Sequence, residues 1–156
     1  MATKKMAIIA TKGALDMAYP PLILASTAAA LGWDVQIFFT FYGLQLLRKD
    51  LSGIAISPLA IPAMPMPVPM PVIVSVLPGM QAMATSMMKA KMKKKGVASL
   101  TELRDLCQEA DVKFIACQMT VDLFEFDKSD FIDGVEYGGA AMFMKFAGET
   151  DVCLFI

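Results

Sequence analysis

Three cysteines in a chain of 156 residues that contains no histidine are the side chains best suited to chemistry. The lack of an imidazole removes the commonest general base and metal ligand, which excludes Ser–His, Cys–His and His–zinc chemistry. Cys107, Cys117 and Cys153 are odd in number and widely spaced, so they form neither a disulfide framework nor a CxxC motif. This pattern predicts free thiols in a reducing compartment, and we therefore expect a cytoplasmic protein.

Cys117 is the strongest candidate for a reactive thiol because of its predicted position. It ends the apolar segment 112–117, which is predicted to be a strand, and Thr120 can cap a short helix that runs to Phe124. Ligands of open parallel sheets bind at the carboxyl ends of strands. The amide groups at a helix start lower the pKa of a thiol, although the nearby carboxylate of Asp122 would oppose this. The alternative is that Cys117 is a small hydrophobic residue that completes its strand.

Two further loops are expected to open on the same edge of the sheet as Cys117. They supply candidate substrate-binding residues, namely Thr11, Lys12, Gly13, Thr40, Tyr42 and Gly43. Lys12 could hold an anionic sulfur species and Tyr42 could form a wall of the pocket, with ordinary turn roles as the alternative for each residue. Lys12 and Gly13 lack the other residues of a Walker motif, so a nucleotide site is only weakly supported.

The other two cysteines are predicted to be inert core thiols. Cys107 lies on the apolar face of a predicted helix, and Cys153 lies within the apolar run 151–156, which predicts a buried strand. A second sulfur site at Cys153 is the less favoured alternative.

The elements that would position these residues alternate between strands and helices, which predicts an α/β fold with a mostly parallel sheet covered on both faces. Strands are predicted over 5–10, 34–40, 72–77, 112–117 and 151–156. Helices are predicted over 16–31, 42–49, 80–95, 99–110, 120–124 and 138–147, the fourth of them with a capping box at Ser99 and Glu102. The length suits a single domain spanning residues 1–156.

The Pro/Met segment 58–78 is interpreted as an extended, insertion-like loop in this domain. Its prolines exclude a transmembrane helix, because each removes a backbone donor and obstructs the preceding turn. The chain is 56% hydrophobic, and a subunit interface is the favoured cover for the apolar side chains of this segment. A peripheral membrane or scaffold protein that uses this segment and Lys89–Lys95 remains an alternative, as does a Met-rich Cu(I)-handling protein. A net charge of −1 argues against nucleic acid as a partner.

The motifs FFTFYGL and ACQMT, together with the opening segment KMAIIATKGALDMAYPP and the closing segment YGGAAMFMKFAGETDVCLFI, are similar to a known family. The chain resembles the DsrE/DsrF/DsrH-like superfamily of sulfur-relay proteins, in its DsrE2-like branch. The resemblance implies a single-domain, doubly wound α/β/α sandwich around a five-stranded sheet, assembled into homo-oligomers. It also implies sulfur donor and acceptor proteins of the TusA-like and rhodanese-like kinds, with possible peripheral membrane contact.

The resemblance places the sulfur-carrying cysteine at Cys117 and assigns no role to Cys107 or Cys153. We therefore expect Cys117 to accept sulfane sulfur as a persulfide and to pass it to a partner protein. The neighbouring residues of the motif, Gln118, Met119 and Thr120, are expected to bind the substrate. Neither a cofactor nor a metal is expected, and whether the protein is a carrier or an enzyme with turnover stays open.

Overall fold

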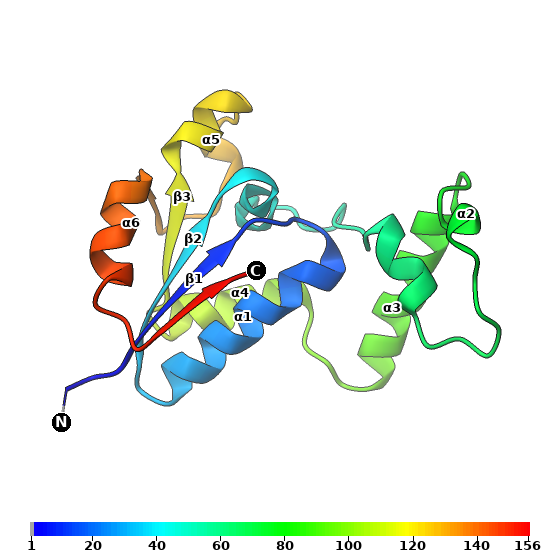
Figure 1. Ribbon diagram of the computed structural model, residues 1–156, viewed down its shortest axis with the longest axis horizontal. Coiled ribbons are helices and arrows are strands. Elements are labelled where there is room, and N and C mark those ends of the chain that lie inside the picture. The colour runs from blue at the N-terminus through cyan, green and yellow to red at the C-terminus, as the bar shows by residue number, and fades with distance from the viewer. Residues whose placement is uncertain (1) are drawn as a thin grey trace.

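A computed structural model describes residues 2–156, and its centre is a five-stranded parallel sheet (Figure 1). The strands are β1 (Lys5–Ala10), β2 (Asp34–Phe39), β3 (Lys113–Cys117), β4 (Val135–Gly138) and β5 (Val152–Phe155). Their order in the sheet is β4-β3-β2-β1-β5, and all four pairings are parallel. The strand order reverses direction at β1, which confirms the predicted doubly wound α/β fold.

The three central strands are apolar on both sides, as expected for strands covered on both faces. Ile8, Ile37 and Phe39 are completely buried on one face, and Ala7 and Ile115 are buried on the other. Continuous apolar runs in the sequence therefore identified these strands correctly.

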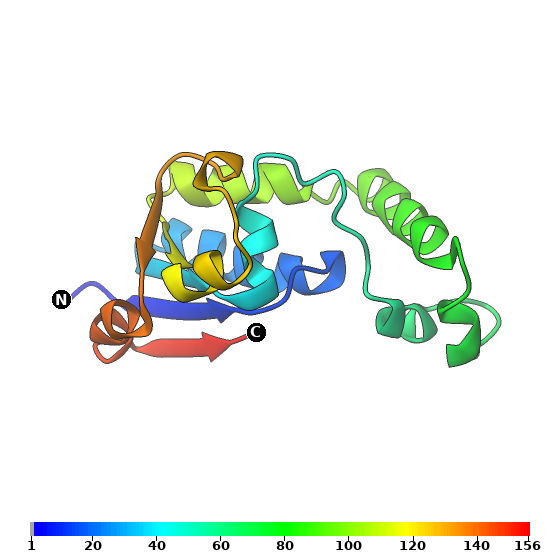
Figure 2. The same ribbon diagram turned by 90° about the horizontal axis from the view of Figure 1, so that it is seen from above.

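Two helices cover one face of the sheet, and they lie side by side there (Figure 2). These are α1 (Leu15–Ala30) and α4 (Leu100–Glu109). The predicted capping box is present at the start of α4, where the Glu102 amide donates to Ser99 Oγ at 3.2 Å and the Ser99 amide donates to Glu102 Oε2 at 2.6 Å. Such a cap satisfies two amides that would otherwise lack partners.

The opposite face is only partly covered. The helix α6 (Ala140–Ala147) packs on it through Phe143, whose ring stacks on that of Phe38 at 4.9 Å between centroids. The short helix α5 (Gln118–Leu123) follows β3 directly at the carboxyl edge of the sheet. The 3₁₀ helix η1 (Phe41–Leu47) follows β2 at the same edge, where a helix over 42–49 was predicted.

One predicted strand is wrong and one strand was missed. The segment 72–77 is not a strand: residues Val72–Ser75 form the short helix α2, capped by Pro71, and no strand lies beside them to supply hydrogen bonds. The fifth strand is instead β4 (Val135–Gly138), just before the segment predicted to be helical over 138–147, which forms α6 as expected. Its sequence VEYG is short and lies at the sheet edge, so it has no continuous apolar run.

The Pro/Met segment forms a projecting lobe with the 3₁₀ helix η2 (Pro58–Ala63), α2 and α3 (Met80–Lys94), which extends away from the sheet in both views (Figures 1 and 2). The lobe has a small core of its own, made by Ile56, Ile61 and Ala84. In the described residues 2–156, no helix is both long and apolar enough to cross a bilayer.

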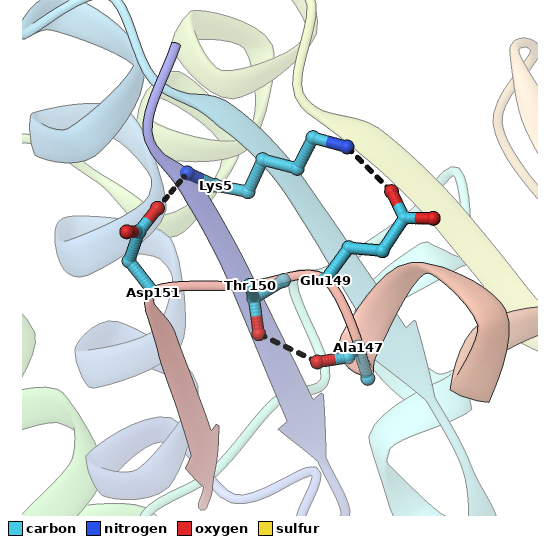
Figure 3. Close-up of polar contacts among 5 residues, drawn as sticks. All are labelled: Lys5, Ala147, Glu149, Thr150 and Asp151. Atoms are coloured by element: carbon cyan, nitrogen blue, oxygen red, sulfur yellow. Dashed lines mark hydrogen bonds and ion pairs between the residues drawn. The ribbon is translucent and has the colours of Figure 1, made fainter. Parts of the chain in front are cut away.

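Polar contacts join the start of β1 to the residues just before the edge strand β5 (Figure 3). The Lys5 amide donates to Asp151 Oδ2 at 2.8 Å, and Lys5 Nζ lies 2.7 Å from Glu149 Oε2. The hydrogen bond between Lys5 and Glu149 raises the pKa of the lysine and lowers that of the glutamate. Thr150 Oγ1 also donates to the Ala147 carbonyl at 2.8 Å, which closes the turn between α6 and β5.

Candidate functional site

Cys117 lies at the point where β3 ends and α5 begins. It is the last residue of the strand, is paired with Gly138 of β4, and forms the N-cap of α5. Its side chain belongs to the apolar cluster under α6, with Phe38 and Phe143. The residue is 5% exposed, so the thiol lies just beneath the surface at the carboxyl edge of the sheet.

The pKa of the Cys117 thiol is set by its burial and by the polar groups of neighbouring residues. Burial raises the pKa of this thiol, but the hydroxyl and amide of Thr120, the hydroxyl of Thr40 and the amide of Met119 outweigh it. Together these donors hold the pKa of Cys117 below the ordinary value of 9.0. Polar hydrogens near a thiol favour its negatively charged form, which stabilises the thiolate relative to the thiol. Among the described residues, polar groups rather than a cation cause this lowering of the pKa.

The two threonines come from different elements and meet beside the sulfur. Thr40 follows β2 and Thr120 lies in the first turn of α5, and their hydroxyl oxygens are 3.2 Å apart. The Phe41 amide also donates to Thr120 Oγ1 at 3.3 Å. Thr120 is completely buried, so its hydroxyl is fixed in this network. The sheet register therefore builds the polar surroundings of Cys117 from two neighbouring strand ends.

The two predicted glycines allow the loops after β1 and β2 to approach each other closely. A Cβ atom on Gly43 would collide with the Ala10 carbonyl, and one on Gly13 would lie 2.5 Å from the Tyr42 carbonyl oxygen. Only a residue without a side chain fits such a backbone approach. Gly13 and Gly43 thus shape the sheet edge by letting its loops pack backbone against backbone.

The remaining candidates on these loops lie apart from the sulfur. Lys12, Gly13 and Tyr42 line a cleft of about 590 Å³ that extends to Ser57 and Leu59 of the projecting lobe, and Cys117 is not part of its lining. Thr11 Oγ1 donates to the Ile156 carbonyl at 3.0 Å. The structure therefore brings Thr40, Met119 and Thr120 to Cys117, and it places Thr11, Lys12 and Tyr42 elsewhere on the edge.

Gln118 is occupied by contacts on the outer side of α5. Its Nε2 donates to Asp122 Oδ1 at 2.7 Å, and Lys128 Nζ donates to its Oε1 at 2.9 Å. Reasoning from the sequence missed Lys128, and it also missed the aromatic pair of Phe41 and Phe124 beside the site. The concentration of aromatic residues in FFTFY and FEF was the available signal for the pair.

The other cysteines differ from each other in their surroundings. Cys107 is completely buried, as predicted, with Sγ 3.4 Å from the Leu22 carbonyl oxygen, and burial raises its pKa to about 12. The prediction of a buried Cys153 is wrong, because this thiol is exposed. It lies on the edge strand β5, on the side that carries the exposed ring of Phe155, where α6 does not extend over the sheet.

The parallel sheet and the hydrogen-bonded thiol at its carboxyl edge define a small α/β protein with a stabilised thiolate. The chain belongs to the DsrE/DsrF/DrsH-like family, which its residues 2–155 match. It is 67% identical to the sulfur carrier protein DsrE2 of Allochromatium vinosum, over the full length of both chains. The chain is thus a homologue of a sulfur carrier.

Two further proteins are similar to this chain at greater distance. The uncharacterized protein YrkE of Bacillus subtilis is 34% identical over 99% of this chain and 98% of its own. The crystal structure of the YchN protein from E. coli matches with a TM-score of 0.56 at 12% identity, over 99% of this chain and 100% of that one. At this identity the likeness to YchN shows the fold alone.

Proposed function

We propose that this protein carries sulfane sulfur as a persulfide on Cys117 and passes it to a partner protein. The observation that carries the proposal is the position of Cys117 between β3 and α5, beside the paired hydroxyls of Thr40 and Thr120, where its pKa is lowered. The full-length similarity to a sulfur carrier supports the same assignment. Neither Cys107, which is sealed in the core, nor Cys153, which lies exposed on the edge strand β5, offers an equivalent setting.

The proposed chemistry is two successive thiol exchanges without net oxidation. The Cys117 thiolate attacks the outer sulfur of a donor persulfide, which forms Cys117–S–SH and releases the donor as its thiolate. An acceptor thiolate then attacks the terminal sulfur, which forms the acceptor persulfide and restores the Cys117 thiolate. The donors that stabilise the thiolate also make it the better leaving group in the second exchange.

Access to the sulfur is limited, and the persulfide itself helps to overcome this. Cys117 is 5% exposed, and its terminal persulfide sulfur would stand about 2 Å beyond Sγ, one S–S bond length away. The attacked atom in the delivery step is therefore the one farthest from the core. Loading, by contrast, needs a donor that reaches the narrow opening or a small displacement of α6 or η1.

We further propose donor and acceptor proteins of the rhodanese-like and TusA-like kinds, in a cytoplasmic setting. Homo-oligomers are proposed as well, since the face of β5 that carries Cys153 and Phe155 is uncovered and Phe155 is 73% exposed. Apolar side chains exposed on a sheet face favour contact with another protein surface.

Intact-mass measurement tests the proposal directly. The protein is incubated with inorganic polysulfide, freed of excess reagent, and then mixed with a thiol acceptor. We expect wild type to gain one sulfur atom and to lose it to the acceptor, and Cys117→Ser to gain none.

Cys153→Ser and Cys107→Ala are the matched controls, because each removes one thiol elsewhere in the fold. Both are expected to load and deliver sulfur like wild type. Retained loading in Cys117→Ser, together with its loss in Cys153→Ser, would refute the assignment.

A second activity, peripheral membrane contact, is favoured by the tip of the projecting lobe. Val72, Ile73, Val76 and Leu77 are between 53% and 74% exposed there, and Lys89–Lys95 supplies five lysines farther along the lobe. The exposed aliphatic tip suits insertion into a lipid surface, and the lysines at the other end of α3, beside the main body, would add attraction to anionic lipid.

Vesicle flotation tests this second proposal. Wild type is expected to float with vesicles that contain phosphatidylserine. The double variant Ile73→Ser, Val76→Ser is expected to remain in the bottom fraction of the gradient, with the unbound protein. Leu31→Ser is the control, since Leu31 is 69% exposed on the main body. Equal flotation of all three proteins, or none by wild type, would exclude a lipid-binding tip.

A further inference from the structure

We propose that a surface beside Cys117 docks partner proteins whose reactive cysteine is surrounded by basic residues. This inference rests on the proposed function and concerns the choice of partner. It follows from an exposed aromatic patch next to the thiol and from the acidic residues that border this patch.

The patch, termed the edge patch, consists of five exposed apolar side chains from η1 and α5. These are Phe41, Tyr42, Met119, Leu123 and Phe124, which are 43%, 64%, 61%, 59% and 37% exposed. Tyr42 stacks on Phe124 at 5.9 Å between ring centroids, and Phe41 meets Phe124 edge-on at 6.2 Å. The rings therefore form one continuous surface. Large aromatic and methionine side chains of this kind are enriched at the centres of protein interfaces.

The edge patch and the sulfur site share the same backbone. Met119, whose side chain is in the patch, lies in the first turn of α5, which directly follows Cys117, and its amide lowers the pKa of that thiol. Phe41, also in the patch, donates its amide to Thr120 Oγ1 at 3.3 Å. Phe41 has a φ of 47°, which is uncommon for a residue with a side chain and requires support from its surroundings. A partner seated on the edge patch would thus lie directly over the groups that hold the sulfur.

Acidic residues border the edge patch on one side and are termed the acidic rim. They are Asp122, Glu125 and Asp127, all of them exposed. Residues 118–138 contain six acidic side chains and only one basic one, Lys128, whose ammonium is engaged with Gln118 and lies 4.3 Å from the Tyr137 ring centroid. Within residues 2–156, no member of the rim takes part in an ion pair. The negative charge of the rim is therefore available to a partner, although Lys12 in the adjoining cleft offsets part of it.

The charge of the rim indicates the chemistry of the partner. Sulfur exchange needs a partner thiol that is ionised, and reactive thiolates are commonly stabilised by surrounding Lys, Arg or helix N-termini. A basic surface around such a cysteine complements the acidic rim, which speeds the encounter and orients the two sulfur atoms. The apolar centre with a charged border is the usual anatomy of a transient interface.

A second copy of this chain is the competing occupant, since its Lys89–Lys95 segment is also basic. A lasting contact between copies at the edge patch would cover the already narrow approach to Cys117. Such a contact would prevent the exchange that the proposed function requires, so the observations favour a transient partner.

The test measures how fast Cys117 persulfide delivers sulfur to three synthetic peptides. They contain one cysteine each and differ only in flanking lysines, glutamates or serines. At low ionic strength we expect the lysine peptide to react about tenfold faster than the glutamate peptide, at matched thiolate concentration. Added salt should reduce this ratio toward one.

Two triple variants with the same change of net charge separate the rim from the rest of the surface. The rim variant is Asp122→Asn, Glu125→Gln, Asp127→Asn, and the control variant is Asp105→Asn, Glu109→Gln, Asp111→Asn. The rim variant is expected to lose the preference for the lysine peptide, and the control variant is expected to keep it.

The outcomes distinguish the docking proposal from the proposed function. Normal loading of Cys117 with equal rates for all three peptides, or an equal loss of preference in both variants, overturns the docking proposal alone. The oligomer mass of the rim variant is also measured by light scattering. A mass below that of wild type would mean that the edge patch binds a second copy of this chain, and not a different partner protein. Failure of wild type to load Cys117 at all overturns the proposed function itself.

Discussion

The hydroxyl oxygens of Thr40 and Thr120 lie 3.2 Å apart, although 80 positions separate the two residues in the chain. The contact joins the residue after β2 to the first turn of α5, and both threonines lower the pKa of the Cys117 thiol beside them. The parallel pairing of β2 with β3 creates this contact, because it brings the two carboxyl ends to the same edge. The thiolate thus depends on the register of the sheet.

The Thr120 hydroxyl should control the acidity of Cys117. Burial raises the pKa of this thiol and the Thr120 hydroxyl is the foremost of the donors that lower it, so Thr120→Val should shift the pKa upward. We expect the alkylation rate of Cys117 in wild type to reach half its maximum below pH 9.0, and at a higher pH in the variant. Alkylation at Cys117 is followed by peptide mass spectrometry.

Thr120→Ser is the control for this prediction, since it keeps the hydroxyl and removes only a methyl group. Its midpoint should stay close to that of wild type. Identical midpoints in Thr120→Val and wild type would show that the hydroxyl does not act on the sulfur.

Cys107 should make the protein less stable at high pH. Its pKa is about 12 in the folded protein, and its ordinary value is 9.0. Between these values the unfolded chain releases the proton while the folded chain retains it, so the free energy of unfolding falls as the pH rises. Urea unfolding at pH 8 and pH 11 should show a smaller decrease for Cys107→Ala than for wild type. Equal decreases would mean that the buried thiol ionises as easily as a free one.

Gly43 should be intolerant of a side chain. Its Cβ would collide with the Ala10 carbonyl, so Gly43→Ala must push apart the ends of β1 and η1, at a cost of about 1–3 kcal/mol in the free energy of unfolding. Because Thr40 lies three residues before Gly43, the variant should also slow the alkylation of Cys117. Both effects are measured by urea unfolding and peptide mass spectrometry.

Gly53→Ala is the matched control, since a Cβ at Gly53 meets no atom within 4 Å. It should leave both stability and Cys117 reactivity within error of wild type. A Gly43→Ala protein as stable as this control would contradict the close approach.

Four of the five strands could be predicted from the sequence because their apolar runs match the buried positions of a parallel sheet. The run 72–77 has the same composition, yet it forms α2 at an exposed site beside Pro71. Strand β4 was missed because it lies at the sheet edge and contains Glu136, so its pattern carries no continuous apolar signal. Composition predicts a strand only where a neighbouring strand is available to pair with it.

The position of Cys117 at the end of β3 could be predicted as well, because it follows from the strand boundary. Which of the surrounding residues lie together with Cys117 could not be predicted from the sequence. Lys12 and Tyr42 follow strands as expected, but the direction of their loops places them in a separate cleft. The exposure of Cys153 depends on how far α6 extends over the sheet, which no local sequence pattern encodes.

Peptide mapping of sulfur in the folded wild-type protein tests the central claim most directly, because all three thiols compete in one molecule. The protein is treated at neutral pH with less than one equivalent of polysulfide, alkylated, digested and analysed by mass spectrometry. The account predicts that the added sulfur lies mainly on the peptide that contains Cys117, even though Cys153 is far more exposed. Sulfur found mainly on Cys153, with Cys117 unmodified, would contradict it.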